Sequence, residues 1–348
     1  MELQLKNIGM IKEANVKIDG LTVIAGENDT GKSTLGRAYY YEVKNYLEEK
    51  IIKSQNNKNQ NNDGIFLGAL LGFGIGLLTD TNPLAGAVIG GVGGKIKDTS
   101  SSKTNGIITK SKNTFDKNIQ LKLNEDEKLF NSIMIETPYS LNSSNYIKTT
   151  QLLAHQRGLN YTLGDHIIDL ILQLSQTPST DNNKIYNKIT DIIDGKLYYD
   201  EERDDFYYHK KSIDKELAMN STATGIKMFG FLQVLLLNKT IREGSVLILD
   251  EPEVHLHPKW QLKYAELIVE LVKNGVYVLI TSHSPYMIEA LERYAEKAEV
   301  TADFYLAEEG VIDKVEDNNS KTLAKIFNKL SAPYETFNQM DSETLKGG

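Results

Sequence analysis

The chain has 348 residues, 40% hydrophobic and 25% charged, a balance typical of a folded globular protein and unlike that of a disordered or fibrous chain. A formal net charge of -8 argues against a broadly basic nucleic-acid-binding surface, although a local basic groove stays open. The absence of cysteine excludes disulfides, thiol catalysis and cysteine-bound zinc. The first residues lack the basic and then apolar pattern of a signal peptide, so we expect a cytoplasmic protein.

The N-terminal part is predicted to form short strands that lead into a glycine-rich loop. Leu3 and Leu5 alternate with polar neighbours, as does the stretch 14–18, which indicates half-buried strands. Residues 21–25 are almost continuously apolar, as in a fully buried strand. A helix is expected over 33–49.

The loop between this strand and this helix fits the phosphate-loop pattern G-x-x-x-x-G-K-[ST] over 26–33. Such a loop presents backbone N–H groups and a helix N-terminus to phosphate oxygens; the alternative is a plain glycine turn. We predict that Lys32 reaches the β- and γ-phosphates of ATP and that the Ser33 hydroxyl coordinates Mg²⁺. The other ATP-binding residues expected here are Gly26, Asn28, Gly31 and Thr34.

Composition changes sharply after the helix. Residues 53–63 and 97–114 are polar and linker-like, and they flank an apolar, glycine-rich block at 64–94. This symmetry predicts an insertion, 53–114, within a host domain formed by 1–52 and 115–348.

The glycine-rich block predicts a helical hairpin. Glycines recur every fourth residue in two runs, a spacing that lets another helix backbone approach closely: Gly68, Gly72, Gly76 and Gly86, Gly90, Gly94. Each arm is short: the arm 65–78 would span about 21 Å at 1.5 Å per residue, less than the ~30 Å hydrocarbon core of a bilayer. A soluble packed hairpin, an oligomerisation element and partial membrane insertion all remain open.

The rest of the host domain alternates buried strands with helices, which predicts an α/β fold with a mainly parallel central sheet and a helical lid over 150–215. The expected strands are 132–136, 196–199, 206–208, 245–249 and 276–280, and the expected helices are 165–176, 183–194, 224–238 and 258–274.

Two of these strands end in residues suited to ATP hydrolysis. Strand 245–249 runs into Asp250 and Glu251, and strand 276–280 is followed closely by His283. We predict that Asp250 holds the Mg²⁺ shell and that Glu251 deprotonates the attacking water, since adjacent acids need different roles. His283 is expected to contact the γ-phosphate, and the alternative for it is a purely structural histidine.

The segments LDEPEVHLHP (249–258) and TSHSP (281–285), with LKNIG (5–9) and GEN (26–28), resemble ABC-type ATPases of the OLD, RecF and SMC group. The resemblance is closest to stand-alone bacterial AAA-family ATPases of OLD type, which occur in anti-phage and toxin-like systems. It covers about 1–50 and 115–315 and leaves out the insertion.

The resemblance implies a signature segment that completes the ATP site of a neighbouring subunit in a head-to-tail homodimer. Residues 220–227 are the candidate, with Gly225 at a helix N-terminus facing the γ-phosphate. Ala223 stands where serine is usual, and Ser221 and Thr222 are the alternatives for the missing hydroxyl. Asp29 takes a loop position that is often glycine, and aspartate tolerates a left-handed backbone. The glutamine of the family's Q-loop has no clear counterpart; Gln151 and Gln156 are its candidates.

The resemblance also implies a function. OLD proteins often carry a Toprim nuclease, but only 65 residues follow His283 and they contain no Asp-x-Asp pair. We therefore expect a Mg²⁺-dependent ATPase whose ATP-driven dimerisation controls a separate nuclease or toxin. The alternative is an ATP-gated oligomeric scaffold or membrane-acting protein that works through 64–94. Chromosome maintenance ranks last because no heptad run is present.

Overall fold

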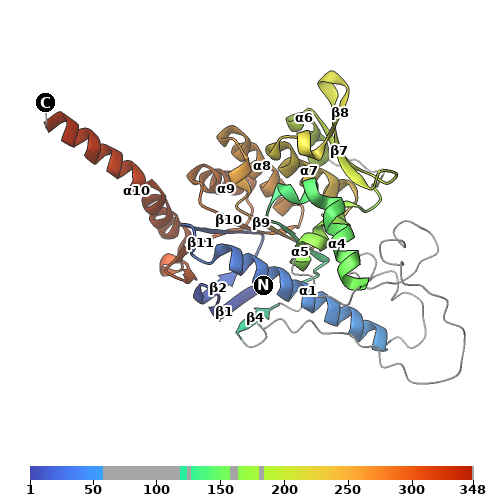
Figure 1. Ribbon diagram of the computed structural model, residues 1–348. Helices are drawn as coiled ribbons and strands as arrows, with labels where there is room; N and C mark the ends of the chain where they lie inside the picture. The colour runs from blue at the N-terminus through green and yellow to red at the C-terminus, as the bar shows by residue number, and fades with distance from the viewer. Residues whose placement is uncertain (58–117, 124–126, 157–163, 180–183, 347–348) are drawn as a thin grey trace, which may run out of the picture.

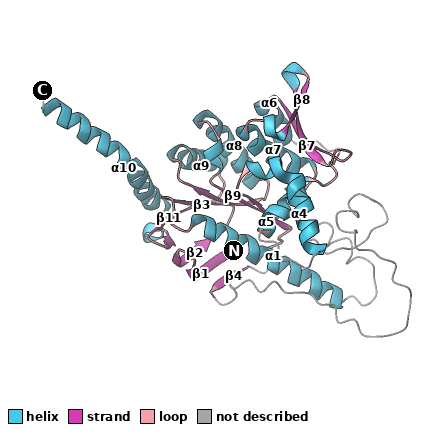
Figure 2. Cartoon of the chain, in the orientation of Figure 1, coloured by secondary structure: helices cyan, strands magenta, loops and turns pink. Residues whose placement is uncertain are grey.

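The computed structural model describes residues 1–57, 118–123, 127–156, 164–179 and 184–346. They build an α/β fold around a nine-stranded sheet with helices on both faces (Figure 1, Figure 2). The strands of this sheet are β1 (Glu2–Ile8), β2 (Ile11–Lys17), β3 (Leu21–Gly26), β4 (Ile119–Lys122), β5 (Asn131–Ile135), β9 (Ser245–Asp250), β10 (Tyr277–Ser282), β11 (Ala302–Glu308) and β12 (Val311–Asp313). A separate antiparallel sheet contains β6 (Gly195–Asp200), β7 (Asp205–Lys210) and β8 (Lys215–Ala218).

The direction of the strands confirms the predicted mainly parallel sheet. The order is β4-β1-β2-β12-β11-β3-β10-β9-β5, and every neighbouring pair from β11 to β5 is parallel. Antiparallel pairs are confined to the other side, at β1–β2, β1–β4 and β11–β12. Because parallel strands end at the same edge, the loops after β3, β5, β9 and β10 gather at one edge of the sheet.

Helices cover the two faces unequally. On one face, α1 (Lys32–Asn57) packs with the inward side chains of β1 and β2. The opposite face is covered by α5 (Asp165–Leu174), α7 (Thr224–Leu237), α8 (Pro258–Lys273) and α9 (Pro285–Ala298). The remaining helices are α4 (Ser144–Gln156), α6 (Lys184–Ile193) and α10 (Asn319–Lys346), and α10 projects away from the body of the molecule (Figure 1).

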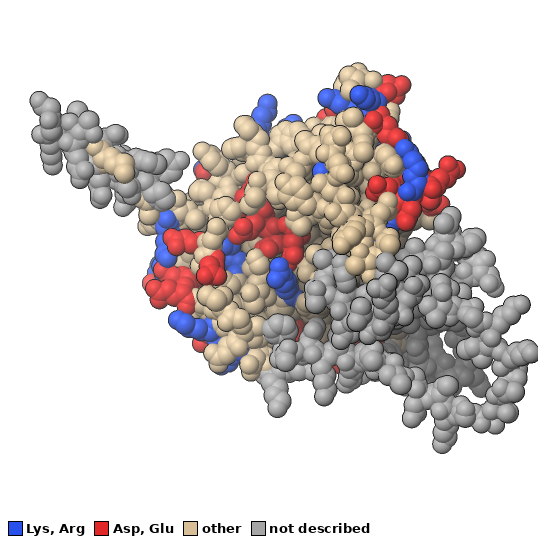
Figure 3. Space-filling model, viewed as in Figure 1, with Lys and Arg blue, Asp and Glu red and all other residues tan. Residues whose placement is uncertain are grey.

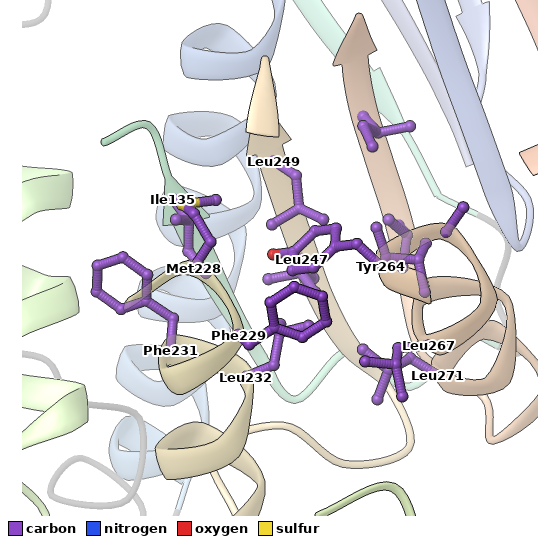
Figure 4. Close-up of a cluster of buried hydrophobic side chains, with 14 of the residues drawn as sticks. Ile135, Met228, Phe229, Phe231, Leu232, Leu247, Leu249, Tyr264, Leu267 and Leu271 are labelled. Carbon is purple, nitrogen blue, oxygen red and sulfur yellow. The ribbon is translucent and has the colours of Figure 1, made fainter. Parts of the chain in front are cut away.

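Helix α7 anchors the strand that carries the predicted catalytic carboxylates. Its residues 227–236 are all buried, as expected for a helix that is apolar almost all round. The Phe229 ring meets the Tyr264 ring of α8 edge-on, at 5.1 Å between centroids, beside Leu247 and Leu249 of β9 (Figure 4). This dense packing fixes β9, and with it the position of Asp250.

Most predicted elements are confirmed, with shifts at their ends. The helix after the phosphate loop continues to Asn57, beyond the predicted end at 49 and into the stretch expected to be a linker. The predicted hairpin is confirmed as β6 and β7, and β8 adds a third strand that was not predicted. The helices α9 and α10 and the strands β11 and β12 were also absent from the prediction.

The predicted insertion lies almost entirely outside the described residues. The hairpin at 64–94 and the resumption of the host domain near Phe115 fall between α1 and β4, and so remain predictions. The predicted lid, 150–215, contains α5, α6, β6 and β7, and its role as a lid is likewise a prediction. Among the described helices, none combines the length and apolar character needed to cross a membrane.

Candidate nucleotide site

The loop between β3 and α1 has the conformation that a phosphate cradle requires. Gly31 adopts φ +94°, and a Cβ atom there would lie 2.7 Å from Ile11 Cγ1, so the position needs glycine. Asp29 adopts φ 64°, as its left-handed tolerance predicts. Within the described part of the chain, no hydrogen bond is donated by the backbone N–H groups of residues 28–33. These groups, at the N-terminus of a long helix, fit an anion.

Lys32 connects this loop to the end of β9. Its side chain is only 3% exposed, and Nζ donates to the carbonyl oxygens of Gly26 at 3.1 Å and Glu27 at 2.7 Å. The same Nζ lies 3.2 Å from Glu251 Oε1. Two residues predicted separately, more than two hundred positions apart, therefore meet at one site.

Asp250 and Ser33 lie together, as a shared metal ligand set requires. The Ser33 side chain is hydrogen-bonded to the Asp250 carboxylate. Burial raises the pKa of Asp250, although this bond and a second one from Thr281 act in the opposite direction. Hydroxyl and carboxylate oxygens are ligands that Mg²⁺ accepts, and this ion usually takes one or two carboxylates together with phosphate oxygens. The pair therefore fits a Mg²⁺ ion bound together with a nucleotide.

Glu251 is held in a strained backbone conformation. Its φ of 46° and ψ of 50° are left-handed, which is rare for a residue other than glycine. The Glu251 N–H donates to the Thr281 carbonyl at 3.1 Å and to Thr281 Oγ1 at 3.0 Å, and Thr281 Oγ1 donates to Asp250 Oδ1. One buried threonine thus orients both carboxylates, a role that the sequence analysis did not assign.

Glu251 and His283 shift each other's pKa values. Their mutual interaction, with a further contribution from Lys32, lowers the pKa of Glu251 to about 2. Glu251 in turn raises the pKa of His283, whose Nδ1 lies 3.5 Å from Glu251 Oε2. Glu251 is therefore ionised at neutral pH, and its pairing with His283 and Lys32 makes it a weaker base than an unpaired glutamate.

The structure does not bring every predicted residue to this point. Asn28 lies in the loop and Thr34 in the first turn of α1, with no described contact to the carboxylates. Gly225 lies in the first turn of α7, where the atoms nearest to a Cβ would be the His255 carbonyl oxygen and the Trp260 ring, each at 3.2 Å. None of these atoms belongs to the phosphate loop of the same chain.

Glu136 joins the site from β5 and was also missed. It directly follows β5, the parallel neighbour of β9, and its charge acts on Asp250. Arg37 Nε of α1 donates to Glu136 Oε1 at 2.5 Å, and His166 Nε2 of α5 lies 2.9 Å from Oε2. Burial would raise the pKa of Glu136, but these two neighbours lower it to about 2. The position of Glu136, an acidic residue at the end of a predicted strand, is the sequence feature that could have identified it.

Comparison with known families settles the class. Residues 97–289, more than half of the chain, match the family described as "AAA domain, putative AbiEii toxin, Type IV TA system". The chain belongs to this family. The matched range contains Asp250, Glu251, His283 and Gly225, whereas the phosphate loop lies before it.

Individual relatives of this AAA-domain protein match only locally. Septu protein PtuA of Bacillus thuringiensis is 44% identical over 48 residues, 14% of this chain and 12% of that protein. Protein ea59 of Escherichia phage lambda is 27% identical over 128 residues, 36% of this chain and 22% of that protein. The matches thus span less than a quarter of the length of these relatives.

Solved structures give a distant likeness to the AAA-domain protein. An ATP-binding cassette of an ABC transporter in its ADP conformation has a TM-score of 0.37 at 13% identity, with 96% of each chain covered. The SMC head domain from Thermotoga maritima has a TM-score of 0.39 at 13% identity, with 90% of this chain and 96% of that chain covered. At these scores the likeness carries no inference about function.

The double role of Thr281 in the AAA-domain site is testable by a pair of substitutions. Thr281→Val keeps the shape of this fully buried side chain but removes the hydroxyl shared by Asp250 and Glu251. We expect any ATP turnover to fall roughly 10- to 100-fold, the value of one hydrogen bond to a charged group. Thr281→Ser restores the hydroxyl and should restore most of the rate. Equal rates in wild type and Thr281→Val, measured by phosphate release, would contradict this role.

Proposed function

We propose that this chain is a Mg²⁺-dependent ATPase of the ABC and OLD type, which converts ATP and water to ADP and phosphate. The proposal rests chiefly on one observation: the buried Lys32 of the phosphate loop lies 3.2 Å from Glu251, the carboxylate expected to act as base. Family membership supports it, since the matched domain is an AAA domain.

Each side chain has a distinct task in the proposed reaction. The free backbone N–H groups of 28–33 bind phosphate oxygens, and Lys32 exchanges the Glu251 carboxylate for the β- and γ-phosphates. Glu251, then released, accepts a proton from the water that attacks the γ-phosphorus. His283 contacts the γ-phosphate from the end of β10. Ser33 and Asp250 would hold Mg²⁺, which would supply charge neutralisation on the phosphates.

We further propose that ATP binding drives a head-to-tail homodimer, in which Gly225 of one subunit completes the site of the other. The location of Gly225 beside Trp260, rather than beside its own phosphate loop, supports a shared site. The dimer then controls a separate effector, a nuclease or toxin, in anti-phage defence. The family description, which includes a toxin of a toxin–antitoxin system, supports such a setting.

Charge gives little support to nucleic acid as the partner. On the face drawn in Figure 3, lysine and arginine side chains alternate with acidic ones instead of gathering in a stripe. A cytoplasmic location fits the proposed ATPase. Assembly or membrane contact through the glycine-rich block at 64–94 remains the alternative route to an effector function, and it rests on the glycine spacing alone.

The ATPase proposal is tested directly by Lys32→Ala in the full chain. Removal of this ammonium takes away the main cation facing the β- and γ-phosphates, so ATP binding or turnover should fall to background. Lys6→Ala is the matched control, because the Lys6 side chain forms an ion pair only with Glu13 among the described residues and is 70% exposed. Phosphate release with Mg²⁺ and ATP is the measurement, and equal rates for Lys32→Ala and Lys6→Ala would refute the assignment.

A further inference from the structure

Glu253 is a buried carboxylate that the reaction described above does not use. It lies in the short turn Pro252–His255 after β9, and only 4% of the residue is exposed. Its Oε1 accepts a hydrogen bond from Ser282 Oγ at 2.7 Å and another from the His283 N–H at 2.8 Å. Its Oε2 has no partner among the described residues. A carboxylate buried with one oxygen unpaired is costly for stability.

The two hydrogen bonds fasten the end of β10 to the end of β9. A second bridge runs beside them, because Ser284 Oγ donates to Gln261 Oε1 at 2.7 Å and Gln261 Nε2 donates to the Leu256 carbonyl at 3.0 Å. His283 is therefore clamped on both sides of its own backbone. The loop that carries this histidine cannot shift without breaking buried hydrogen bonds.

Glu253 also faces the imidazole itself. His283 Nδ1 lies 3.5 Å from Glu253 Oε1 and 3.5 Å from Glu251 Oε2. Two carboxylates on the Nδ1 side favour a proton on that nitrogen, since a carboxylate attracts an N–H and repels a lone pair. The opposite nitrogen, Nε2, can donate to a phosphate oxygen when the ring carries both protons, and the hydrogen bond with Glu251 favours that form by raising the pKa of His283. The side chain keeps 37% of its surface exposed.

We propose that Glu253 is a positioning residue for His283. It fixes the backbone and the ring orientation of this histidine so that Nε2 faces the γ-phosphate. The inference deepens the ATPase proposal and rests on it. A purely structural role, in which Glu253 only stabilises the turn after β9, makes different predictions.

Glu253→Gln separates the two roles. Glutamine keeps an oxygen that accepts from Ser282 and His283, and so preserves the turn, but it removes the negative charge beside Nδ1. We expect unchanged folding and ATP affinity, KM within about threefold of wild type, and kcat lower by roughly 10- to 100-fold, the range for one hydrogen bond to a charged group. Ser282→Ala removes the bond to Glu253 and the one that Ser282 Oγ accepts from the Ser284 N–H, but it leaves the charge beside Nδ1, so it should cost less activity than Glu253→Gln.

A double-mutant cycle decides whether Glu253 acts through His283. If it does, Glu253→Gln combined with His283→Ala should be no slower than His283→Ala alone. The proposal would be overturned if the two substitutions reduced kcat independently, so that their fold-reductions multiply in the double variant. A wild-type kcat in Glu253→Gln would also overturn it. Loss of folding in Glu253→Gln, seen by circular dichroism, would assign Glu253 to structure instead.

A readout without turnover keeps this inference distinct from the ATPase proposal. Side-chain ¹⁵N spectra of labelled protein, with His283 assigned by its loss in His283→Ala, report which ring nitrogen carries the proton. We expect Nδ1 protonation in wild type and a smaller share of it in Glu253→Gln. Identical spectra would refute the positioning role. A wild-type protein that hydrolyses no ATP would refute the ATPase proposal, and the spectra would still test the contact.

Discussion

Replacement of Glu251 by glutamine is expected to abolish ATP turnover and to leave ATP binding intact. The Glu251 carboxylate, with its pKa lowered to about 2, is ionised at neutral pH and can accept a proton from water. Glutamine has nearly the same shape but no basic oxygen, so turnover should fall at least about 100-fold, as for the loss of a general base. The change also removes the ion pair at 3.2 Å that occupies Lys32, which leaves this cation free for phosphate.

The trapped state should be visible as an assembly. If ATP holds two subunits together until it is hydrolysed, Glu251→Gln should form a stable dimer with ATP and Mg²⁺, seen by light scattering after size-exclusion chromatography. Glu266→Gln is the matched control, because the Glu266 side chain is 53% exposed on α8. A wild-type hydrolysis rate in Glu251→Gln would exclude Glu251 as the base, and a monomer with bound ATP would contradict the dimer.

The parts of the site that could be predicted from the sequence are those formed by consecutive residues. The phosphate loop and the pair at 250 and 251 are short patterns next to buried strands, so the element and the residue are found together. The parallel order of β3, β10 and β9 then brings Lys32 and Glu251 into contact. The position of His283 one strand after Asp250 and Glu251 added this residue, which a lone histidine at a strand end would not have justified.

Other parts of the site depend on contacts that no local pattern reveals. Glu136, Arg37 and His166 come from β5, α1 and α5, and only the packing of α5 beside the sheet brings His166 to the acid. Thr281 acts because the registers of β9 and β10 place it opposite Asp250. Such pairings depend on tertiary structure, and periodicity along the chain does not encode them.

Helix ends were misjudged for a related reason. Residues 53–57, with lysine, serine, glutamine and two asparagines, were predicted to begin a polar linker, yet the helix continues through them to Asn57. Lysine and glutamine are good helix formers, and the preceding helix supplies the nucleus, so extension costs little. Composition alone does not separate a solvent-exposed helical turn from a linker.

The N-terminus of α7 offers a clean way to test a shared site. Gly225 itself is a poor position for a bulky change, since a Cβ would lie 3.2 Å from both the His255 carbonyl oxygen and the Trp260 ring. Ala223 is exposed and is the N-cap of α7, with no side-chain hydrogen bond to the helix. Aspartate at an N-cap stabilises a helix by about 1 kcal/mol relative to alanine. Ala223→Asp therefore adds a negative charge without endangering the fold.

In the proposed head-to-tail dimer, this charge faces the γ-phosphate bound to the other subunit, and Ala223→Asp should lose ATP turnover while it gains thermal stability. Ala223→Ser is the neutral control, which adds a cap without a charge and should keep or raise the rate. Mixed with inactive Lys32→Ala subunits, Ala223→Asp should recover up to about a quarter of the wild-type rate, since half of randomly formed dimers are mixed and each has one intact site of two. Phosphate release from the mixture, with mixed dimers demonstrated by two affinity tags, is the measurement. Mixed dimers without recovered activity would argue that each subunit hydrolyses ATP with its own residues. Two subunits with different defects can form one intact site only if each site takes residues from both chains.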